Sequence, residues 1–271
     1  MDELASNLAA LMALSSFAGG RLWGAREGAG RPRVLALPGW GRDHTDFAPV
    51  LAGLDAVALD LPGFGAAPDP PEAWSTAEYA QLVGAALSDF AGRVTVVGHS
   101  FGARVAAHLA ADPRVTALVL TGAPLAPEPG QRGVRPSPLY RTARALSRVG
   151  VVSAERMERF RNKYGSEDYR RASPVMRGVL VKSVQETATS AYIPALRAFA
   201  SAGGSLELVW GAEDKVASLE GVSAALAGLP DGVVRVTTVS GAGHLFTPAL
   251  VEALRSALLR QGASAADDGA R

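Results

Sequence analysis

The chain lacks cysteine, a strong net charge and any long apolar run. Its 271 residues include no cysteine, and the formal net charge is only +1. Without cysteine, disulfides, thiolate catalysis and cysteine-ligated metals are excluded. A nearly neutral chain also has no overall electrostatic attraction to nucleic acid. We therefore expect neither a nucleic-acid partner nor a disulfide scaffold.

The amino-terminal residues show no signal for export or membrane insertion. The apolar run from Leu8 to Leu14 is far shorter than the roughly 20 residues that span a bilayer. Asp2 and Glu3 stand where a signal peptide would carry basic residues. The sequence thus predicts a cytoplasmic protein without a transmembrane segment, and it leaves the oligomeric state open.

Strand-like and helix-like segments alternate along most of the chain. Many of the strand-like runs are apolar throughout, which is typical of a parallel sheet covered on both faces. We therefore expect an α/β fold with a mostly parallel central sheet flanked by helices. The predicted strands are 21–24, 34–37, 56–61, 94–97, 117–121, 206–210 and 233–239, and the predicted helices are 76–90, 103–111, 221–229 and 248–259.

This alternation stops between Pro124 and about Gly204. Several prolines lie at the entry to the stretch, and an arginine-rich segment without a clear strand follows. Within it, Ser173 and Pro174 have the pattern of a helix N-cap followed by proline at the first helical position. The stretch is therefore predicted to be helical.

Charge separates the same stretch from the rest of the chain. Residues 127–200 hold 14 Lys or Arg and 6 acidic residues, a net charge of +8 that leaves −7 elsewhere. We interpret residues 126–200 as a helical cap inserted into a core made of residues 1–125 and 201–271. Its arginines are expected to form a solvated face, or alternatively to steer an anionic substrate.

The most informative motif is Gly-His-Ser-Phe-Gly at residues 98–102, directly after the apolar run 94–97. A G-x-S-x-G motif between a strand and a helix is typical of a nucleophile elbow, a strained turn that lifts the serine hydroxyl off the strand end. The two glycines leave room for neighbouring backbone. Ser100 is therefore the candidate nucleophile.

A serine hydroxyl attacks an ester only when a base, usually histidine, takes its proton. Three of the four histidines have other interpretations: His99 supports the elbow from inside, His108 packs on the following helix or faces solvent, and His44 lies in a loop that could line a pocket. His244 follows a small-residue loop at the end of the last predicted strand. Sites of α/β proteins form at that edge of the sheet, so His244 is the predicted base.

A carboxylate must orient this histidine, and in the order Ser…Asp/Glu…His it lies between the two. Asp214 and Glu213 directly follow a predicted strand. We favour Asp214, three residues past Gly211, with Glu213 as the alternative because a one-residue change in the turn would exchange them. A solvated ion pair with Lys215 is the non-catalytic interpretation.

The anion that forms on the attacked carbonyl needs preorganised N–H donors. The predicted donors are the Phe101 N–H, at the start of the helix after the nucleophile, and the Trp40 N–H, in a glycine-containing loop after an early strand.

The substrate pocket is predicted to involve Trp40, Tyr140 and the apolar residues after His244, which are Leu245 and Phe246. The histidines lack metal-ligand spacing, and there is no phosphate loop or dinucleotide fingerprint. We therefore expect neither a metal nor a cofactor.

Together these motifs resemble the α/β-hydrolase superfamily, in its form with a serine nucleophile and a helical cap. The loop at 38–41 is similar to the His-Gly-x-Gly oxyanion loop, although proline replaces the histidine, and residues 60–65 are similar to the structural Asp-x-Pro-Gly-x-Gly turn. The elbow, the segment 211–214 and the pair 243–244 match the three elements of the catalytic triad in order. A serine nucleophile argues against dehalogenases and epoxide hydrolases of the fold, which carry aspartate there.

This resemblance implies a serine hydrolase that cleaves a carboxylic ester or related acyl bond of a small molecule through an acyl-enzyme on Ser100. A carbon–carbon bond hydrolase or lyase-like synthase of the same fold, acting on an anionic substrate, is the first alternative. A non-catalytic binding module is a weaker one, because such a module need not retain the nucleophile, the base and the acid together.

Overall fold

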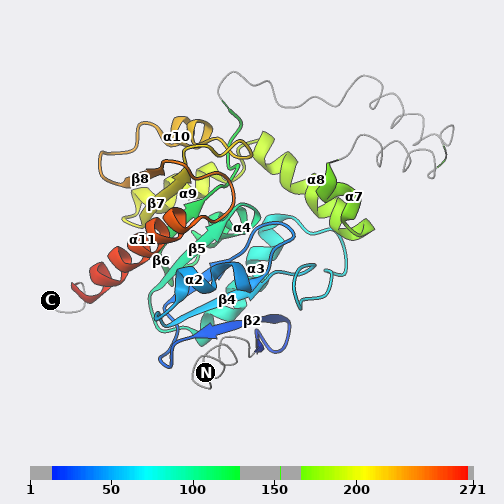
Figure 1. Cartoon of the computed structure of the whole chain (residues 1–271), viewed down its shortest axis with the longest axis horizontal. Helices are drawn as coiled ribbons and strands as arrows, with labels where there is room; N and C mark the ends of the chain where they lie inside the picture. The colour runs from blue at the N-terminus through cyan, green and yellow to red at the C-terminus, as the bar shows by residue number, and fades with distance from the viewer. Residues whose placement is uncertain (1–13, 129–152, 154–165, 268–271) are drawn as a thin grey trace.

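A twisted sheet of eight strands forms the centre of the molecule (Figure 1). The computed structural model describes residues 14–128, 153 and 166–267. The strand order is β1-β2-β4-β3-β5-β6-β7-β8, with antiparallel pairing of β2 to both β1 and β4 and parallel pairing elsewhere. The strands are β1 (Leu14–Phe17), β2 (Leu22–Glu27), β3 (Val34–Leu37), β4 (Ala56–Asp60), β5 (Val94–His99), β6 (Val115–Thr121), β7 (Ser205–Gly211) and β8 (Val234–Val239).

The sheet confirms the predicted α/β class with its mostly parallel sheet. The central strands β3 and β4 are buried at every position, which explains their uninterrupted apolar sequences, because helices cover both of their faces. β1 was not predicted. It is a short edge strand with a mostly exposed or half-buried sequence, so no apolar run marks it.

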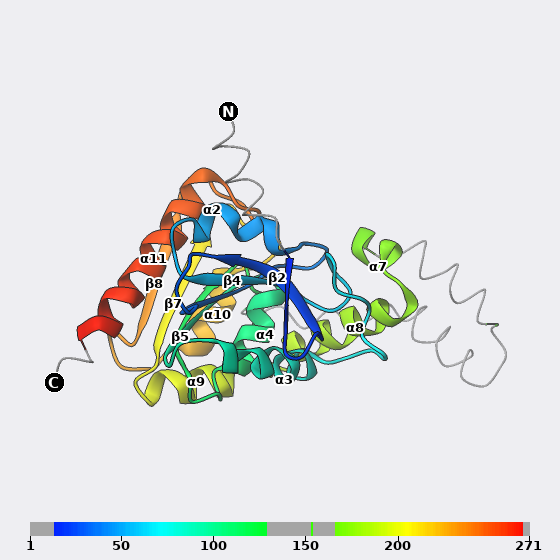
Figure 2. The same ribbon diagram turned by 90° about the horizontal axis from the view of Figure 1, so that it is seen from below.

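Helices cover the two faces of the sheet in separate groups, as Figure 2 shows. One face carries α2 (Ala48–Leu51) and α11 (Pro248–Asp267), and the other carries α3 (Thr76–Ala86), α4 (Phe101–Leu109) and α9 (Ile193–Ser201). Short 3₁₀ helices at His44–Phe47 and Leu87–Asp89 and the helix α10 (Leu219–Leu226) complete these layers. α3 begins at a capping box in which Ser75 and Glu78 each accept a hydrogen bond from the other's backbone N–H.

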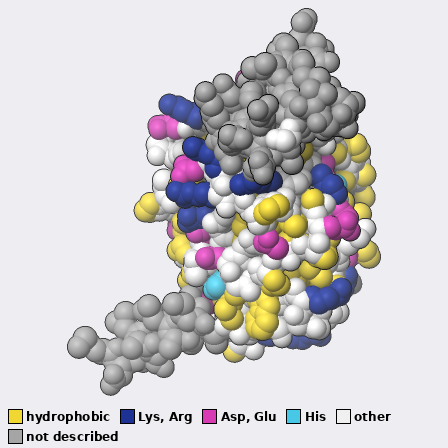
Figure 3. Space-filling view, turned by 90° about the vertical axis from the view of Figure 1, so that its right-hand side faces the viewer, with side chains coloured by type: hydrophobic (Ala, Val, Ile, Leu, Met, Phe, Trp, Pro, Cys, Tyr) yellow, Lys and Arg dark blue, Asp and Glu magenta, His cyan; other side chains and the backbone are white. Residues whose placement is uncertain are grey.

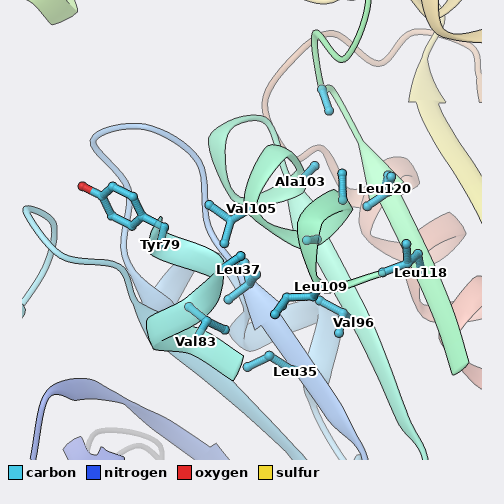
Figure 4. Packing of buried hydrophobic residues seen from close by; sticks show 14 of the residues in the cluster. Leu35, Leu37, Tyr79, Val83, Val96, Ala103, Val105, Leu109, Leu118 and Leu120 are labelled. Atoms are coloured by element: carbon cyan, nitrogen blue, oxygen red, sulfur yellow. The ribbon is translucent and has the colours of Figure 1, made fainter. Parts of the chain in front are cut away.

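The core under α3 and α4 fixes α4, the helix directly after Ser100, on the sheet. Leu35, Leu37, Val96 and Leu118 rise from the strands toward these helices (Figure 4), and all four are fully buried. Because α4 starts directly after β5 and packs on this layer, its first turn is held at the carboxyl edge of the sheet. That edge is where the candidate site lies.

Between β6 and β7 the described residues form helices and no strand. These are α7 (Glu167–Arg171), α8 (Pro174–Ala188) and then α9. α8 begins as predicted, because the Ser173 side chain accepts a hydrogen bond from the Met176 N–H and Pro174 occupies the first helical position. The division of the chain into cap and core remains a prediction.

A chain of partly buried polar contacts holds α8 against α4. His108 on α4 bonds the Thr76 hydroxyl at 3.0 Å, and Thr76 in turn donates to the Glu186 carboxylate on α8 at 2.7 Å. The Tyr192 hydroxyl donates to the same carboxylate at 3.0 Å. His108 thus has the packing role that the sequence indicated.

Among the described residues, no helix is long and apolar enough to cross a membrane.

Candidate active site

Ser100 lies in the strained turn that the motif predicted. Its backbone has φ 51° and ψ −109°, a left-handed φ that is rare outside glycine. The Ser100 N–H donates to the Thr121 carbonyl at 2.9 Å, which ties the turn to β6. A Cβ on Gly98 would overlap the Ala103 backbone, and one on Gly102 would overlap the Leu37 carbonyl. Both glycines are therefore needed where the helix turns back over the strand.

The structure brings Ser100, His244 and Asp214 together, although they are far apart in sequence. The His244 Nε2 atom lies 3.2 Å from the Ser100 hydroxyl oxygen, and the Nδ1 atom lies 2.9 Å from Asp214 Oδ2. An ionised carboxylate accepts but cannot donate, so Nδ1 carries the proton and Nε2 is free to accept the serine proton. This is the geometry of a nucleophile, a base and an orienting acid.

Asp214, and not Glu213, makes the contact with the imidazole. The Asp214 side chain is 1% exposed, and its Oδ1 atom accepts from the Val216 and Ala217 N–H groups at 2.8 and 3.0 Å. Burial raises the pKa of this carboxyl, but the hydrogen bonds from His244 and the two amides outweigh burial and hold the pKa below its ordinary value. Glu213 is exposed.

His99 holds the backbone of His244 in place. The sequence indicated a supporting role for His99 only in general terms. Its ring is 3% exposed, and its Nε2–H donates to the His244 carbonyl at 2.9 Å. Burial, with a smaller contribution from the charge of His244, lowers the pKa of His99 to about 4. A neutral His99 therefore fixes the backbone of the neighbouring histidine at neutral pH.

Gly122 is a site residue that sequence analysis missed. It follows β6 with φ +56°, and a Cβ there would lie 3.2 Å from His244 Cε1 and Nδ1 and 3.2 Å from His99 Nε2. Both imidazoles thus pack against a backbone position that only glycine leaves open. The glycine directly after an apolar strand was the available signal, but nothing in the sequence relates it to two histidines so distant from it.

Both residues predicted to supply oxyanion donors lie beside Ser100. Phe101 is the first residue of α4, and a Cβ on Gly39 would lie 3.4 Å from Ser100 Cβ, so the loop that carries Trp40 passes directly over the serine. Neither the Phe101 nor the Trp40 N–H donates to a described residue. Two backbone donors next to Ser100 are therefore free to bind an anion.

The residues predicted to line the substrate pocket lie in different surroundings. The Trp40 ring packs edge-on against Phe64 and Phe101, 5.0 and 5.4 Å between centroids, and forms an aromatic cluster with them. Tyr140 lies outside the described residues. Leu245 is 59% exposed, whereas Phe246 packs on Phe47 and His99.

A cavity of about 630 Å³ adjoins the segment after His244. Leu245, Phe246, Val251 and His99 line it, together with residues of the loop and helices after β3. Leu245 and Phe246 thus border this cavity, which lies on the α2 and α11 side of the sheet.

His44 contributes to a structural contact and not to the candidate triad. The Asp60 carboxylate is fully buried and accepts from the His44 N–H and the Ala66 N–H, each at 2.8 Å, while the His44 ring also contacts it at 2.8 Å. Asp43 is close enough to complete a three-residue group of possible metal ligands within the described part of the chain. Its carboxylate instead caps the following turn through Thr45.

Comparison with known proteins agrees with this fold. The chain matches the alpha/beta hydrolase family over residues 34–254, and it belongs to that family. A search of curated proteins found no match.

Similar solved structures come from several organisms. A meta-cleavage product hydrolase from Pseudomonas fluorescens aligns with a TM-score of 0.63 at 17% identity, covering 95% of this chain and 99% of that one. A monoacylglycerol lipase from Paleococcus ferrophilus aligns with a TM-score of 0.62 at 19% identity, covering 89% and 97%. A thermophilic esterase from Thermogutta terrifontis aligns with a TM-score of 0.60 at 18% identity, covering 93% and 98%. At these identities the similarity concerns the fold alone.

Proposed function

We propose that this member of the family is a serine hydrolase that cleaves a carboxylic ester or related acyl bond of a small molecule. The observation that carries the proposal is the His244 ring, which contacts the Ser100 hydroxyl through Nε2 and the Asp214 carboxylate through Nδ1. An imidazole held at both nitrogens in this way serves as the base that activates a serine.

In the proposed acylation step, the Ser100 oxygen attacks the carbonyl carbon while His244 Nε2 takes the serine proton. The Asp214 carboxylate holds the Nδ1–H and stabilises the imidazolium that forms. The Trp40 and Phe101 N–H groups bind the negative oxygen of the tetrahedral intermediate. When the intermediate collapses, His244 returns the proton to the departing alcohol and the acyl group remains on Ser100.

Water then hydrolyses the acyl-enzyme, with water in place of the serine hydroxyl as the attacking group. His244 takes a proton from a water molecule that attacks the acyl-enzyme, and the second tetrahedral intermediate returns this proton to Ser100 as the acid leaves. Apart from the substrate and the water molecule, these steps use only groups of the chain itself.

The test is hydrolysis of p-nitrophenyl esters from acetate to decanoate by the wild type, Ser100→Ala and Ser88→Ala. Ser88 is an exposed serine in the 3₁₀ helix Leu87–Asp89 that follows α3, so its variant is a matched control. We expect turnover by the wild type and Ser88→Ala, and a loss of about 10³-fold or more in Ser100→Ala. An active-site-directed fluorophosphonate should label the same two active proteins.

Two outcomes would contradict the ester proposal. Full activity in Ser100→Ala would remove the nucleophile from its role. Labelling of Ser100 without turnover of any ester would instead favour the carbon–carbon bond or lyase-like alternative, which uses the same three side chains on an anionic substrate.

A further inference from the structure

Arg104 is a buried cation next to the candidate nucleophile. It lies one helical turn after Ser100 on α4, where its backbone N–H donates to the Ser100 carbonyl at 3.3 Å. The residue is only 9% exposed.

The guanidinium has few partners for a group so deeply buried. Nη1 donates to the Ser183 hydroxyl on α8 at 3.0 Å, which places the group between the nucleophile helix and α8. Nε has no hydrogen-bond partner. Among the described residues, it is the only buried side-chain nitrogen or oxygen atom that lacks one. Because a guanidinium has five N–H donors, most of its capacity stays unused by the described residues.

Glu186 acts on this charge from a distance but makes no ion pair with it. Glu186, also on α8, accepts from the Thr76 hydroxyl at 2.7 Å, from the Thr76 N–H at 3.3 Å and from the Tyr192 hydroxyl at 3.0 Å. Within the described residues, no ion pair includes Arg104. Burial lowers the pKa of Arg104, as expected for a cation that lacks a contacting anion.

A purely structural arginine in this position would gain by pairing with Glu186, because a buried, unpaired charge is costly. An arginine kept unpaired between a catalytic helix and the helix above it instead fits an anion that arrives with the substrate. A carboxylate matches the planar guanidinium, which can donate two parallel N–H bonds to it.

We propose that Arg104 is a specificity-determining residue that binds a second carboxylate on the acyl part of the substrate. The inference rests on the proposed function and names its substrate class: monoesters of short dicarboxylic acids. The ester carbonyl reaches Ser100, and the free carboxylate at the other end of the acyl chain reaches Arg104. Since the two residues are one helical turn apart, an acyl chain of a few carbons connects them.

The kinetic test compares two esters of equal chain length. Mono-p-nitrophenyl glutarate carries the terminal carboxylate, and p-nitrophenyl valerate does not. We expect Arg104→Met to lower kcat/KM for the glutarate ester by about 10- to 100-fold, the usual effect of losing a charge-assisted hydrogen bond. The valerate ester should change by less than about 2-fold, because it has no group for Arg104 to bind.

Lys182→Met is the matched control for charge. Lys182 precedes Ser183 on α8, its side chain is 45% exposed, and it contacts Glu78. Its loss removes one positive charge from α8 without altering the buried guanidinium.

An equal decrease for both esters in Arg104→Met would indicate a structural role and overturn the proposal. A decrease in Lys182→Met as large as in Arg104→Met would indicate long-range steering and also overturn it. Lys and Arg side chains are scattered over the face of the molecule that Figure 3 shows, so this control is necessary.

A binding measurement separates this inference from the proposed function. In Ser100→Ala, which cannot turn over esters, glutarate should raise Tm by a few degrees at saturation, whereas uncharged glutaramide should not. The shift should disappear when Arg104→Met is added. Arg104→Gln replaces Arg104→Met if the latter does not fold.

The two proposals can therefore fail separately. A glutarate shift that depends on Arg104, in a protein that hydrolyses no ester, would retain the anion site and refute the esterase. Ester turnover without any effect of Arg104 on the glutarate shift or on ester preference would refute the anion site alone.

Discussion

Replacing Gly122 by alanine should damage the candidate site through a single added methyl group. The new Cβ would lie 3.2 Å from the Nδ1 and Cε1 atoms of His244, closer than carbon and nitrogen pack without strain. The ring cannot withdraw freely, because Asp214 holds it at 2.9 Å on one side and Ser100 lies at 3.2 Å on the other. The methyl group must therefore displace the imidazole or the backbone of β6 by a few tenths of an ångström.

Two separate effects set the magnitude. The φ of +56° is in the left-handed region, which costs an alanine about 1–2 kcal/mol of folding free energy. Displacement of the base acts on catalysis instead. Since a 1 Å misplacement of a reacting group can cost about 100-fold, a shift of a few tenths should lower kcat by roughly 3- to 10-fold.

The assay is kcat on a p-nitrophenyl ester, corrected for the folded fraction, beside urea unfolding of the same samples. Gly53→Ala is the control, because Gly53 has φ +76° and nothing within 4 Å of its missing Cβ. Both variants should lose stability through the left-handed φ, Gly122→Ala somewhat more because its methyl group also displaces neighbouring atoms, and only Gly122→Ala should lose activity. Equal kcat in the two variants would refute the argument that the missing Cβ at Gly122 positions the base.

Two further expectations concern the other supports of the imidazole. Asp214→Asn should lower kcat by about 10³- to 10⁴-fold, because an amide favours the wrong tautomer of His244. Glu213→Gln should change kcat by less than about 2-fold. We would measure kcat of both variants, and a larger loss in Glu213→Gln would make Glu213 the orienting acid. For His99, the folded pKa of about 4 lies below the ordinary 6.5, so the unfolded chain takes up the proton first as the pH falls. Stability from the neutral ring is complete above pH 6.5 and is lost as the pH falls to 4, at most about 3 kcal/mol. Urea unfolding at pH 7, 5.5 and 4.5 should therefore show a smaller decrease for His99→Gln than for the wild type, and parallel decreases would contradict the assignment.

Several features of the site could be predicted because residues close together in the sequence determine them. A strand, a G-x-S-x-G turn and a helix follow one another without interruption, so the place of Ser100 depends on residues close to it. The loop glycines before His244 identify that histidine in the same way. Locally encoded caps, such as Ser173 with Pro174, also appear where the sequence predicts them.

Other features depended on residues distant in sequence. Which of Asp214 and Glu213 contacts His244 depends on the side chain that the turn directs inward. The sequence alone does not distinguish two adjacent acids in this respect. Gly122 matters only because β6 lies beside β5 and two imidazoles pack against its end. Arg104 resembles any basic helix residue until α8 is placed over it and Glu186 is found bonded elsewhere.

The sequence by itself determined the α/β class, the nucleophile turn and the order of the candidate catalytic elements, because hydrophobic periodicity and turn chemistry act over a few neighbouring residues. Only the tertiary structure decided which acid faces His244, what supports that histidine from below, and which buried charge remains unpaired. These properties depend on burial and on contacts between separate strands and helices. Such contacts exist only after the sheet has brought distant segments to one edge.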